Sequence, residues 1–168
     1  MPPVVINRYQ PCLIDKLMDS QPASRDDGRS RAVSAQAYEA GLLRDLEWLL
    51  NCNAHVPVVD GKYNPLFDFP DAQNSVVNYG VRQLVGQSAF EVRDFEQRIA
   101  TAIRTFEPRI NPQTLVVKGR IEGNSVYCEI DAEYWAEPIP LRKLIKTKVD
   151  LETGSAEVLS GQGARMSR

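Results

Sequence analysis

An acid and a base stand two residues apart, on either side of a proline, in the segment Glu107-Pro108-Arg109. Two kinds of chemistry suit this pair. Glu107 can serve as a general acid if its surroundings keep it protonated, or it can form an ion pair with the planar guanidinium of Arg109. Pro108 disfavours helical backbone at the residue before it, so we expect both charges at the end of a helix.

Acid catalysis at this corner is disfavoured by the charge of Arg109. A nearby positive charge keeps a carboxyl ionised, whereas glycoside hydrolysis needs one carboxyl that stays protonated. The other acidic candidates are Glu47, Glu129 and Asp131. The last two alternate on a strand face that we expect to meet solvent, where nothing would keep an acid protonated. Ion pairing is therefore favoured, either as an internal brace between helix and sheet or as a contact with a partner.

Nucleophilic and metal chemistry find few suitable residues. His55 is the single histidine of the 168 residues, and it follows Cys52 by three positions with no residue placed to orient either side chain. The three cysteines, Cys12, Cys52 and Cys128, form no CxxC pair and favour reduced thiols over disulfides or zinc. No glycine-rich phosphate loop precedes a helix. We expect no catalytic residue, no metal and no cofactor.

Two amphipathic helices are expected to position the corner. The first spans residues 34–52 with Ser34 as N-cap, and the second spans residues 88–106 with Ser88 and Glu91 as a capping box. Trp48 lies off the first apolar stripe, as either the rim of the core or an interface anchor. The two apolar stripes are Tyr38, Leu42, Leu46 and Leu49, and Val92, Phe95, Ile99, Ala102, Ile103 and Phe106.

After the corner the apolar residues alternate, which is typical of strands. Gly123-Asn124 reads as the two-residue turn of a hairpin. Further strands are expected at residues 146–151 and 156–159, after an interruption at 137–140. The hairpin turn sets the pairs Ile121 with Val126, Gly119 with Cys128, Val117 with Ile130 and, on the solvent side, Lys118 with Glu129.

This order predicts an α+β fold in which two main N-terminal amphipathic helices pack on a C-terminal, mainly antiparallel β-sheet. We expect residues 1–33 to form an N-terminal arm and polar linker, residues 34–160 a single α+β domain, and residues 161–168 a disordered tail. A short helical turn is expected near residues 75–79 of the long connection between the helices.

The net charge of -2 does not favour binding to nucleic acid, and no stretch is long and apolar enough for membrane insertion. Without an apolar run of signal length after Met1, we expect a cytoplasmic protein.

Several short motifs follow one another along the chain. They are Leu13-Ile14-Asp15-Lys16-Leu17, Asp45-Leu46-Glu47-Trp48-Leu49-Leu50-Asn51, Asn78-Tyr79-Gly80, Glu107-Pro108-Arg109 and Lys148-Val149-Asp150-Leu151-Glu152-Thr153-Gly154. In this order and spacing they resemble the TssE family of the type VI secretion system baseplate, which is similar to the wedge-core subunit of contractile phage tails. The resemblance covers nearly the whole chain.

The resemblance implies a non-enzymatic subunit of the baseplate wedge, within a large hetero-oligomer assembled at the inner membrane around the inner tube. The implied partners are the baseplate subunits TssF, TssG and TssK and the TssB–TssC sheath, whose polymerisation the subunit would help to start. The Glu-Pro-Arg signature of the family falls on Glu107, Pro108 and Arg109 and is expected to hold wedge contacts. Together with Trp48 these are the candidate protein-interaction residues.

Two alternatives and two structural hypotheses accompany this interpretation. The phage relatives carry an old lysozyme label, so one alternative is a peptidoglycan-cleaving enzyme. The other is a regulatory binding module, since a stress-response anti-adaptor shares this fold. We further hypothesise that an unpaired strand at the sheet edge receives a sheath strand. For the N-terminal arm two alternatives stay open: it docks on a wedge neighbour, or it folds back on its own core as a strand or helix.

Overall fold

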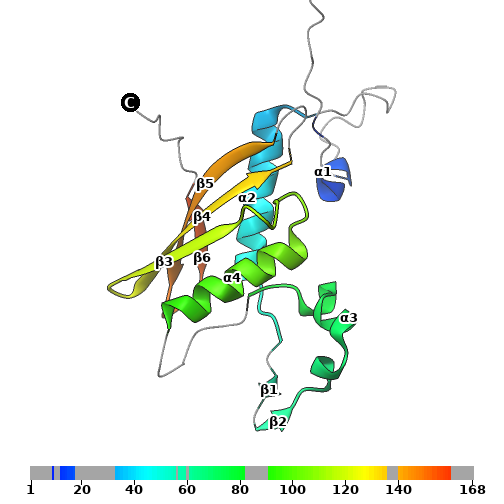
Figure 1. Ribbon diagram of the computed structural model, residues 1–168, viewed down its shortest axis with the longest axis vertical. Coiled ribbons are helices and arrows are strands. Elements are labelled where there is room, and N and C mark those ends of the chain that lie inside the picture. The colour runs from blue at the N-terminus through cyan, green and yellow to red at the C-terminus, as the bar shows by residue number, and fades with distance from the viewer. Residues whose placement is uncertain are drawn as a thin grey trace, which may run out of the picture.

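The computed structural model describes residues 9, 12–17, 33–55, 57–59, 61–81, 91–135 and 140–159. The main helices precede the main sheet, which confirms the predicted α+β fold (Figure 1). Within these ranges, no helix combines the length and the apolar character needed to cross a membrane. The elements are α1 (Leu13–Leu17), α2 (Ala35–Asn51), β1 (Val58–Val59), β2 (Lys62–Tyr63), η1 (Pro65–Asp68), α3 (Pro70–Gln73), η2 (Val76–Asn78), α4 (Val92–Phe106), β3 (Val116–Glu122), β4 (Ser125–Tyr134), β5 (Leu141–Asp150) and β6 (Ala156–Leu159).

The main sheet has the strand order β3-β4-β5-β6, and each neighbouring pair is antiparallel. The hairpin predicted around Gly123-Asn124 is confirmed. Alternate residues of β4 are buried, so one face of the sheet packs on the helices and the other faces solvent. The observed pairs include all those expected: Ile121–Val126, Gly119–Cys128, Val117–Ile130 and Lys118–Glu129.

The third strand of this sheet is longer than predicted. β5 begins at Leu141, directly after Pro140, and not at Lys146. Its first residues lack a clean alternation, but β4 extends to Tyr134 and supplies backbone partners as far as Leu141. The ladder therefore continues where the side-chain pattern does not indicate a strand. β6 spans the predicted residues 156–159.

The helices α2 and α4 cover the buried face of the sheet. Ser34 is the N-cap of α2 as predicted, and its hydroxyl accepts a hydrogen bond from the N–H of Ala37 at 3.1 Å. The expected apolar stripes of both helices form the core. Side chains that are less than 2 % exposed include Leu42 and Leu46 of α2, Ile99 and Ile103 of α4, and Ile130 of β4.

The predicted start of the second helix is wrong. The N-cap of α4 is Glu91 rather than Ser88, and the Glu91 side chain makes no capping hydrogen bond. The first two turns pack on β3 instead: Glu96 accepts a hydrogen bond from the N–H of Gly119 at 2.6 Å, and a Cβ at Gly119 would lie 2.9 Å from Cγ1 of Val92. Contact with a strand thus fixes this end, which a local capping pattern does not indicate. Residues 88–90 lie outside the described residues.

The connection between α2 and α4 extends away from the sheet (Figure 1). This connecting loop, residues 53–81, contains β1, β2, η1, α3 and η2. The short helical turn predicted near residues 75–79 is confirmed by η2, whose N-cap is Ser75. The polar linker before residue 33, residues 137–139 of the interruption predicted at 137–140, and the tail from residue 160 lie outside the described residues. The expected domain boundaries stay predictions.

Candidate functional site

The Glu-Pro-Arg corner stands where the prediction placed it, directly after α4. The helix ends at Phe106, and the N–H of Glu107 donates the last helical hydrogen bond to the Ile103 carbonyl at 2.9 Å. After Pro108 the chain joins the end of β4, where the N–H of Trp135 donates to the Arg109 carbonyl at 2.8 Å. The corner therefore fastens the last helix to the central hairpin.

The Arg109 side chain folds back onto Glu107. Its Nε lies 2.7 Å from Glu107 Oε1 and its Nη2 lies 2.5 Å from Oε2, which is a bidentate ion pair. The backbone N–H of Arg109 adds a third hydrogen bond to Oε1 at 3.1 Å. The Glu107 side chain is only 6 % exposed. A buried carboxylate is thus fully paired within the chain.

Arg109 has a second acidic partner, which comes from α2. Arg109 Nη2 also donates to Asp45 Oδ2 at 2.7 Å, and the guanidinium lies over the Tyr38 ring at 6.0 Å from its centroid. The sequence left open whether Arg109 pairs with Glu107, with another residue of the chain or with a partner. The structure provides both intramolecular partners. In the sequence, the place of Asp45 at the start of the Asp45–Asn51 motif is its one signal, and no pattern there links it to Arg109.

The pairing continues outward from Asp45 as one alternating series. Arg44 donates to Asp45 Oδ1 from Nε at 3.0 Å and from Nη2 at 2.9 Å, and its Nη1 lies 2.6 Å from Asp15 of α1. The Cys12 thiol donates to the other Asp15 oxygen at 2.9 Å. We call Glu107, Arg109, Asp45, Arg44 and Asp15 the charge chain. It links the first helix of the molecule to the corner.

The pKa values of Arg109 and Asp15 are shifted toward their charged forms by their partners in this chain. Burial alone lowers the pKa of the Arg109 guanidinium, but the hydrogen bonds and charges of Glu107 and Asp45 outweigh burial and leave that pKa above its ordinary value. The hydrogen bond from Arg44 holds the pKa of the Asp15 carboxyl below its ordinary value, and the bond from Cys12 acts in the same direction.

The Asn78-Tyr79-Gly80 motif fastens the connecting loop beside the corner. The Tyr79 ring packs edge-on against Phe106 with centroids 5.3 Å apart, and its hydroxyl lies 3.5 Å from the Asp45 carbonyl. Gly80 has φ +127°, and a Cβ there would lie 2.2 Å from the Cys52 carbonyl oxygen. Only glycine fits this close approach of two backbone segments.

Comparison with known proteins identifies the family. The family model described as baseplate wedge protein gp25 matches residues 36–139, well over half of the chain. The chain belongs to this baseplate wedge family. The match runs from α2 through the connecting loop, α4 and the corner to the β3–β4 hairpin. No curated protein and no solved structure matches the chain.

The last residue of the Asp45–Asn51 motif has a separate role in this wedge-family fold. The Asn51 amide lies against β6, where its Nδ2 donates to the Ala156 carbonyl at 2.8 Å and its Oδ1 accepts from the Ala156 N–H at 2.9 Å. The side chain thus imitates a neighbouring strand at one residue of the sheet edge. In this wedge-family chain, one motif therefore holds both the corner, through Asp45, and the sheet edge.

The remaining candidate residues lie apart from the corner. Cys52 follows the end of α2, while the His55 N–H donates to Asn78 Oδ1 at 3.0 Å. Glu129 Oε1 lies 3.7 Å from Lys146 Nζ, and Asp131 forms an ion pair with Arg142. Both acids lie on the solvent face of the sheet. Within the described residues, no three Cys, His, Asp or Glu side chains gather as metal ligands.

Trp48 and Cys128 occupy opposite environments. Trp48 is 47 % exposed and carries the Arg44 guanidinium 5.1 Å above its ring, so it is not a core residue. Cys128 is buried in the sheet, and burial raises the pKa of its thiol to about 12. A thiol that stays protonated at neutral pH is a poor nucleophile.

Proposed function

We propose that this chain is a non-enzymatic subunit of a type VI secretion baseplate wedge, assembled at the cytoplasmic side of the inner membrane. In this role it joins the wedge subunits TssF and TssG, and TssK linked to them, around the inner tube, and it helps to start polymerisation of the TssB–TssC sheath. Membership of the baseplate wedge family carries the proposal, because the matched residues include the corner and the two helices that position it, α2 and α4.

The state of Glu107 supports a structural over an enzymatic role. A general acid must be protonated and free to approach substrate. Glu107 accepts three hydrogen bonds from Arg109 and is buried, so its carboxylate oxygens are already occupied and a substrate has no access to them. The family's lysozyme label therefore has no counterpart in this carboxylate.

A peptidoglycan assay separates the two roles. We expect purified protein to leave peptidoglycan intact, and Glu107→Gln to change nothing in that assay. Turnover that disappears in Glu107→Gln would overturn the structural proposal and support the alternative enzyme.

The wedge contact is best assigned to the exposed candidate residues, Pro108 and Trp48. Glu107 and Arg109 already pair with each other and with Asp45, so they support the surface from beneath. Pro108 and Trp48 lie at the surface, and an exposed tryptophan supplies the large rigid area typical of interface anchors. We infer that partners touch Trp48 and Pro108, and that the ion pair keeps Pro108 in position.

Co-expression tests this assignment. We expect a tagged chain to recover co-expressed TssF and TssG, and Trp48→Ala to reduce that recovery about tenfold or more without unfolding the protein, as removal of an interface hot spot does. Phe69→Ala is the matched control, because Phe69 is an exposed aromatic residue of the connecting loop. Equal recovery by both variants would remove Trp48 from the interface. Failure of the wild type to recover either subunit would count against the baseplate assignment.

The sheath proposal concerns the edges of the sheet, which are β3 and β6. The N–H of Asp150 on β5 donates to the Ser155 carbonyl, so Ser155 points its backbone groups toward β5. Because these groups alternate along an antiparallel strand, the N–H and carbonyl groups of Ala156 and Val158 point away from β5, at the free edge of β6. Asn51 already bonds to both backbone groups of Ala156. On β3 the residues whose backbone groups point away from β4 are 117, 119 and 121. Among the described residues, Glu96 bonds to one of these groups, the N–H of Gly119. We therefore assign the incoming sheath strand to β3.

A proline at each edge distinguishes the two strands. Ile121→Pro removes an outward N–H and leaves the β3–β4 ladder intact, and Val158→Pro does the same for β6. We expect Ile121→Pro to remain folded by circular dichroism and to abolish sheath assembly in cells, with Val158→Pro assembling normally. Normal assembly in both variants would contradict strand addition at either edge.

A further inference from the structure

The side chain of Glu96 borders the free edge of β3. Helix α4 and β3 lie side by side here (Figure 1), and Glu96 Oε1 accepts a hydrogen bond from the Gly119 N–H at 2.6 Å. A Cβ at Gly119 would lie 3.5 Å from Glu96 Cγ, so the missing side chain lets the helix approach the strand closely. The edge that is open to an incoming strand therefore has a carboxylate beside it.

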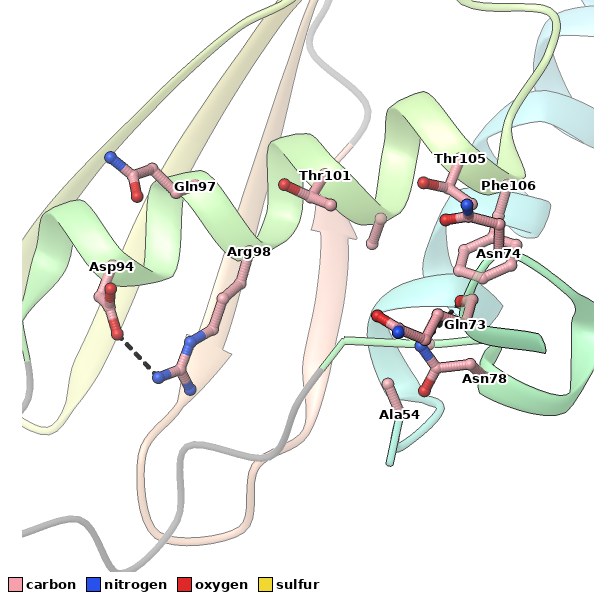
Figure 2. A pocket seen from close by; sticks show the side chains of 12 residues that line it. Ala54, Gln73, Asn74, Asn78, Asp94, Gln97, Arg98, Thr101, Thr105 and Phe106 are labelled. Carbon is pink, nitrogen blue, oxygen red and sulfur yellow. Dashed lines mark hydrogen bonds and ion pairs between the residues drawn. The ribbon is translucent and has the colours of Figure 1, made fainter. Parts of the chain in front are cut away.

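The Glu96 carboxylate has no cationic partner in the described part of the chain. A carboxylate can accept about four hydrogen bonds, and the described residues supply Glu96 with one neutral donor, the Gly119 N–H. The neighbouring acid of the same helix differs, because Asp94 is paired with Arg98 at 2.7 Å (Figure 2). Glu96 is thus an acid at the sheet edge with capacity to bind a cation.

A strand added to β3 would place one of its side chains close to Glu96. Directly opposed residues of neighbouring strands point to the same face of a sheet. On its other side Gly119 is opposite Cys128 of β4, which is buried on the face that packs against the helices. The incoming residue opposite Gly119 therefore points toward α4, at the level of Glu96.

The two neighbours of Gly119 carry positive charge on the other face of the sheet. Lys118 and Arg120 are exposed on the solvent face of β3, and Lys118 is opposite Glu129 of β4. Opposite charges on directly opposed residues stabilise a pair of strands, and like charges destabilise it. An incoming strand is therefore complementary to β3 when acidic residues oppose Lys118 and Arg120.

These three positions define one charge pattern. We propose that the β3 edge selects an incoming strand in which a lysine or arginine stands between two acidic residues. The base lies opposite Gly119 and pairs with Glu96, while the acids lie opposite Lys118 and Arg120. The pattern is symmetric, so it holds for either strand direction. This inference rests on the proposed addition of a sheath strand to β3 and names the chemistry of that strand.

Photo-crosslinking identifies the incoming strand. We place p-benzoylphenylalanine at Ile121, an exposed residue of β3, in cells that assemble sheaths. We expect a crosslink within about three residues of a base that stands between two acids. The same probe at Leu159, an exposed residue of the opposite edge strand β6, is the control and should not yield this product. A crosslinked segment without the pattern would overturn the proposal, and the absence of any crosslink at Ile121 would remove strand addition together with it.

Charge variants separate recognition from simple cover of the edge. Glu96→Gln keeps an oxygen that accepts from the Gly119 N–H and loses the charge, so a role confined to covering the edge predicts wild-type assembly. One opposite-charge pair between strands predicts about 1.5- to 5-fold fewer sheaths per cell, counted with a fluorescent sheath subunit. Glu96→Lys should lose more, because repulsion replaces attraction. Asp94→Lys is the matched control on the same helix and should assemble as the wild type does.

An exchange of charges tests the pair itself. Replacing the base of the crosslinked strand by glutamate should impair assembly with the wild type and restore it with Glu96→Lys. Circular dichroism and recovery of the wedge subunits check that each variant is folded and joins the wedge. Failure of this rescue, or normal assembly of Glu96→Gln and Glu96→Lys, would overturn the proposal. If Ile121→Pro still abolishes assembly in that case, strand addition at β3 stands and only the selection by charge is lost.

Discussion

The two ends of the charge chain use the same chemistry in different surroundings. At the inner end, the side chains of Glu107, Arg109 and Asp45 are 6 %, 19 % and 19 % exposed. At the outer end, Arg44 and Asp15 are 32 % and 29 % exposed, and they hold the five-residue helix α1. The distances at both ends are short, so burial and not geometry distinguishes them.

This difference assigns different roles to the two ends. A buried charge whose partner is removed cannot be solvated, so the inner end must stay intact for the corner to keep its shape. A pair that is about one-third exposed is compensated by water when it opens and contributes less. The inner end is therefore a fixed support for the surface at Pro108. The outer end is an ion pair that can open without unfolding the domain.

The largest effect is expected from Arg109→Ala. The change leaves the carboxylates of Glu107 and Asp45 next to each other with no cation between them, and removing one partner of a buried pair costs about 3–5 kcal/mol. Urea denaturation followed by circular dichroism measures the loss. Adding Glu107→Gln to Arg109→Ala should restore part of the stability, because it removes the stranded charge. A loss below about 1 kcal/mol in the single variant would show that the inner end does not support the fold.

A smaller loss is expected from Glu107→Gln alone. The amide keeps the size of the side chain but loses the charge, while Arg109 retains its pair with Asp45. One charge-assisted hydrogen bond is worth about 1.5–3 kcal/mol, so the loss should fall in that range. Thermal unfolding compares the two variants directly. A greater loss than that of Arg109→Ala would reverse the assignment of Arg109 as the central member.

Local and distant contacts explain which of these features the sequence predicts. The β3–β4 register follows from a two-residue turn and an alternating pattern, both contained within the residues that pair. Arg109 meets Asp45 across 64 positions, and Asn51 meets Ala156 across 105. No periodicity links such residues, so the corner was predicted from Pro108 while its third member was not. The start of α4 was missed for the same reason, since Gly119 of a later strand determines it.

A still smaller effect is expected at the outer end, from Asp15→Asn. The change removes the ion pair with Arg44, and pairs with this exposure contribute about 0.2–1 kcal/mol. Hydrogen exchange should become faster in residues 12–17 and stay unchanged at the corner. Arg98→Ala is a matched control, because it breaks an exposed pair on α4 far along the sequence from α1. Faster exchange at residues 107–109 in Asp15→Asn would mean that the two ends open together.

The pH dependence of the outer end has a definite sign. Because Arg44 lowers the pKa of the Asp15 carboxyl in the folded protein, the pair contributes its full stability at pH values above the ordinary pKa of about 4. That contribution is lost as the pH falls through the lowered pKa of the folded state. The stability difference between wild type and Asp15→Asn should thus stay constant from pH 7 to about pH 5 and shrink below pH 4. A difference that does not change with pH would mean that asparagine disturbs the packing of α1 and that the charge of Asp15 does not stabilise the contact between α1 and Arg44.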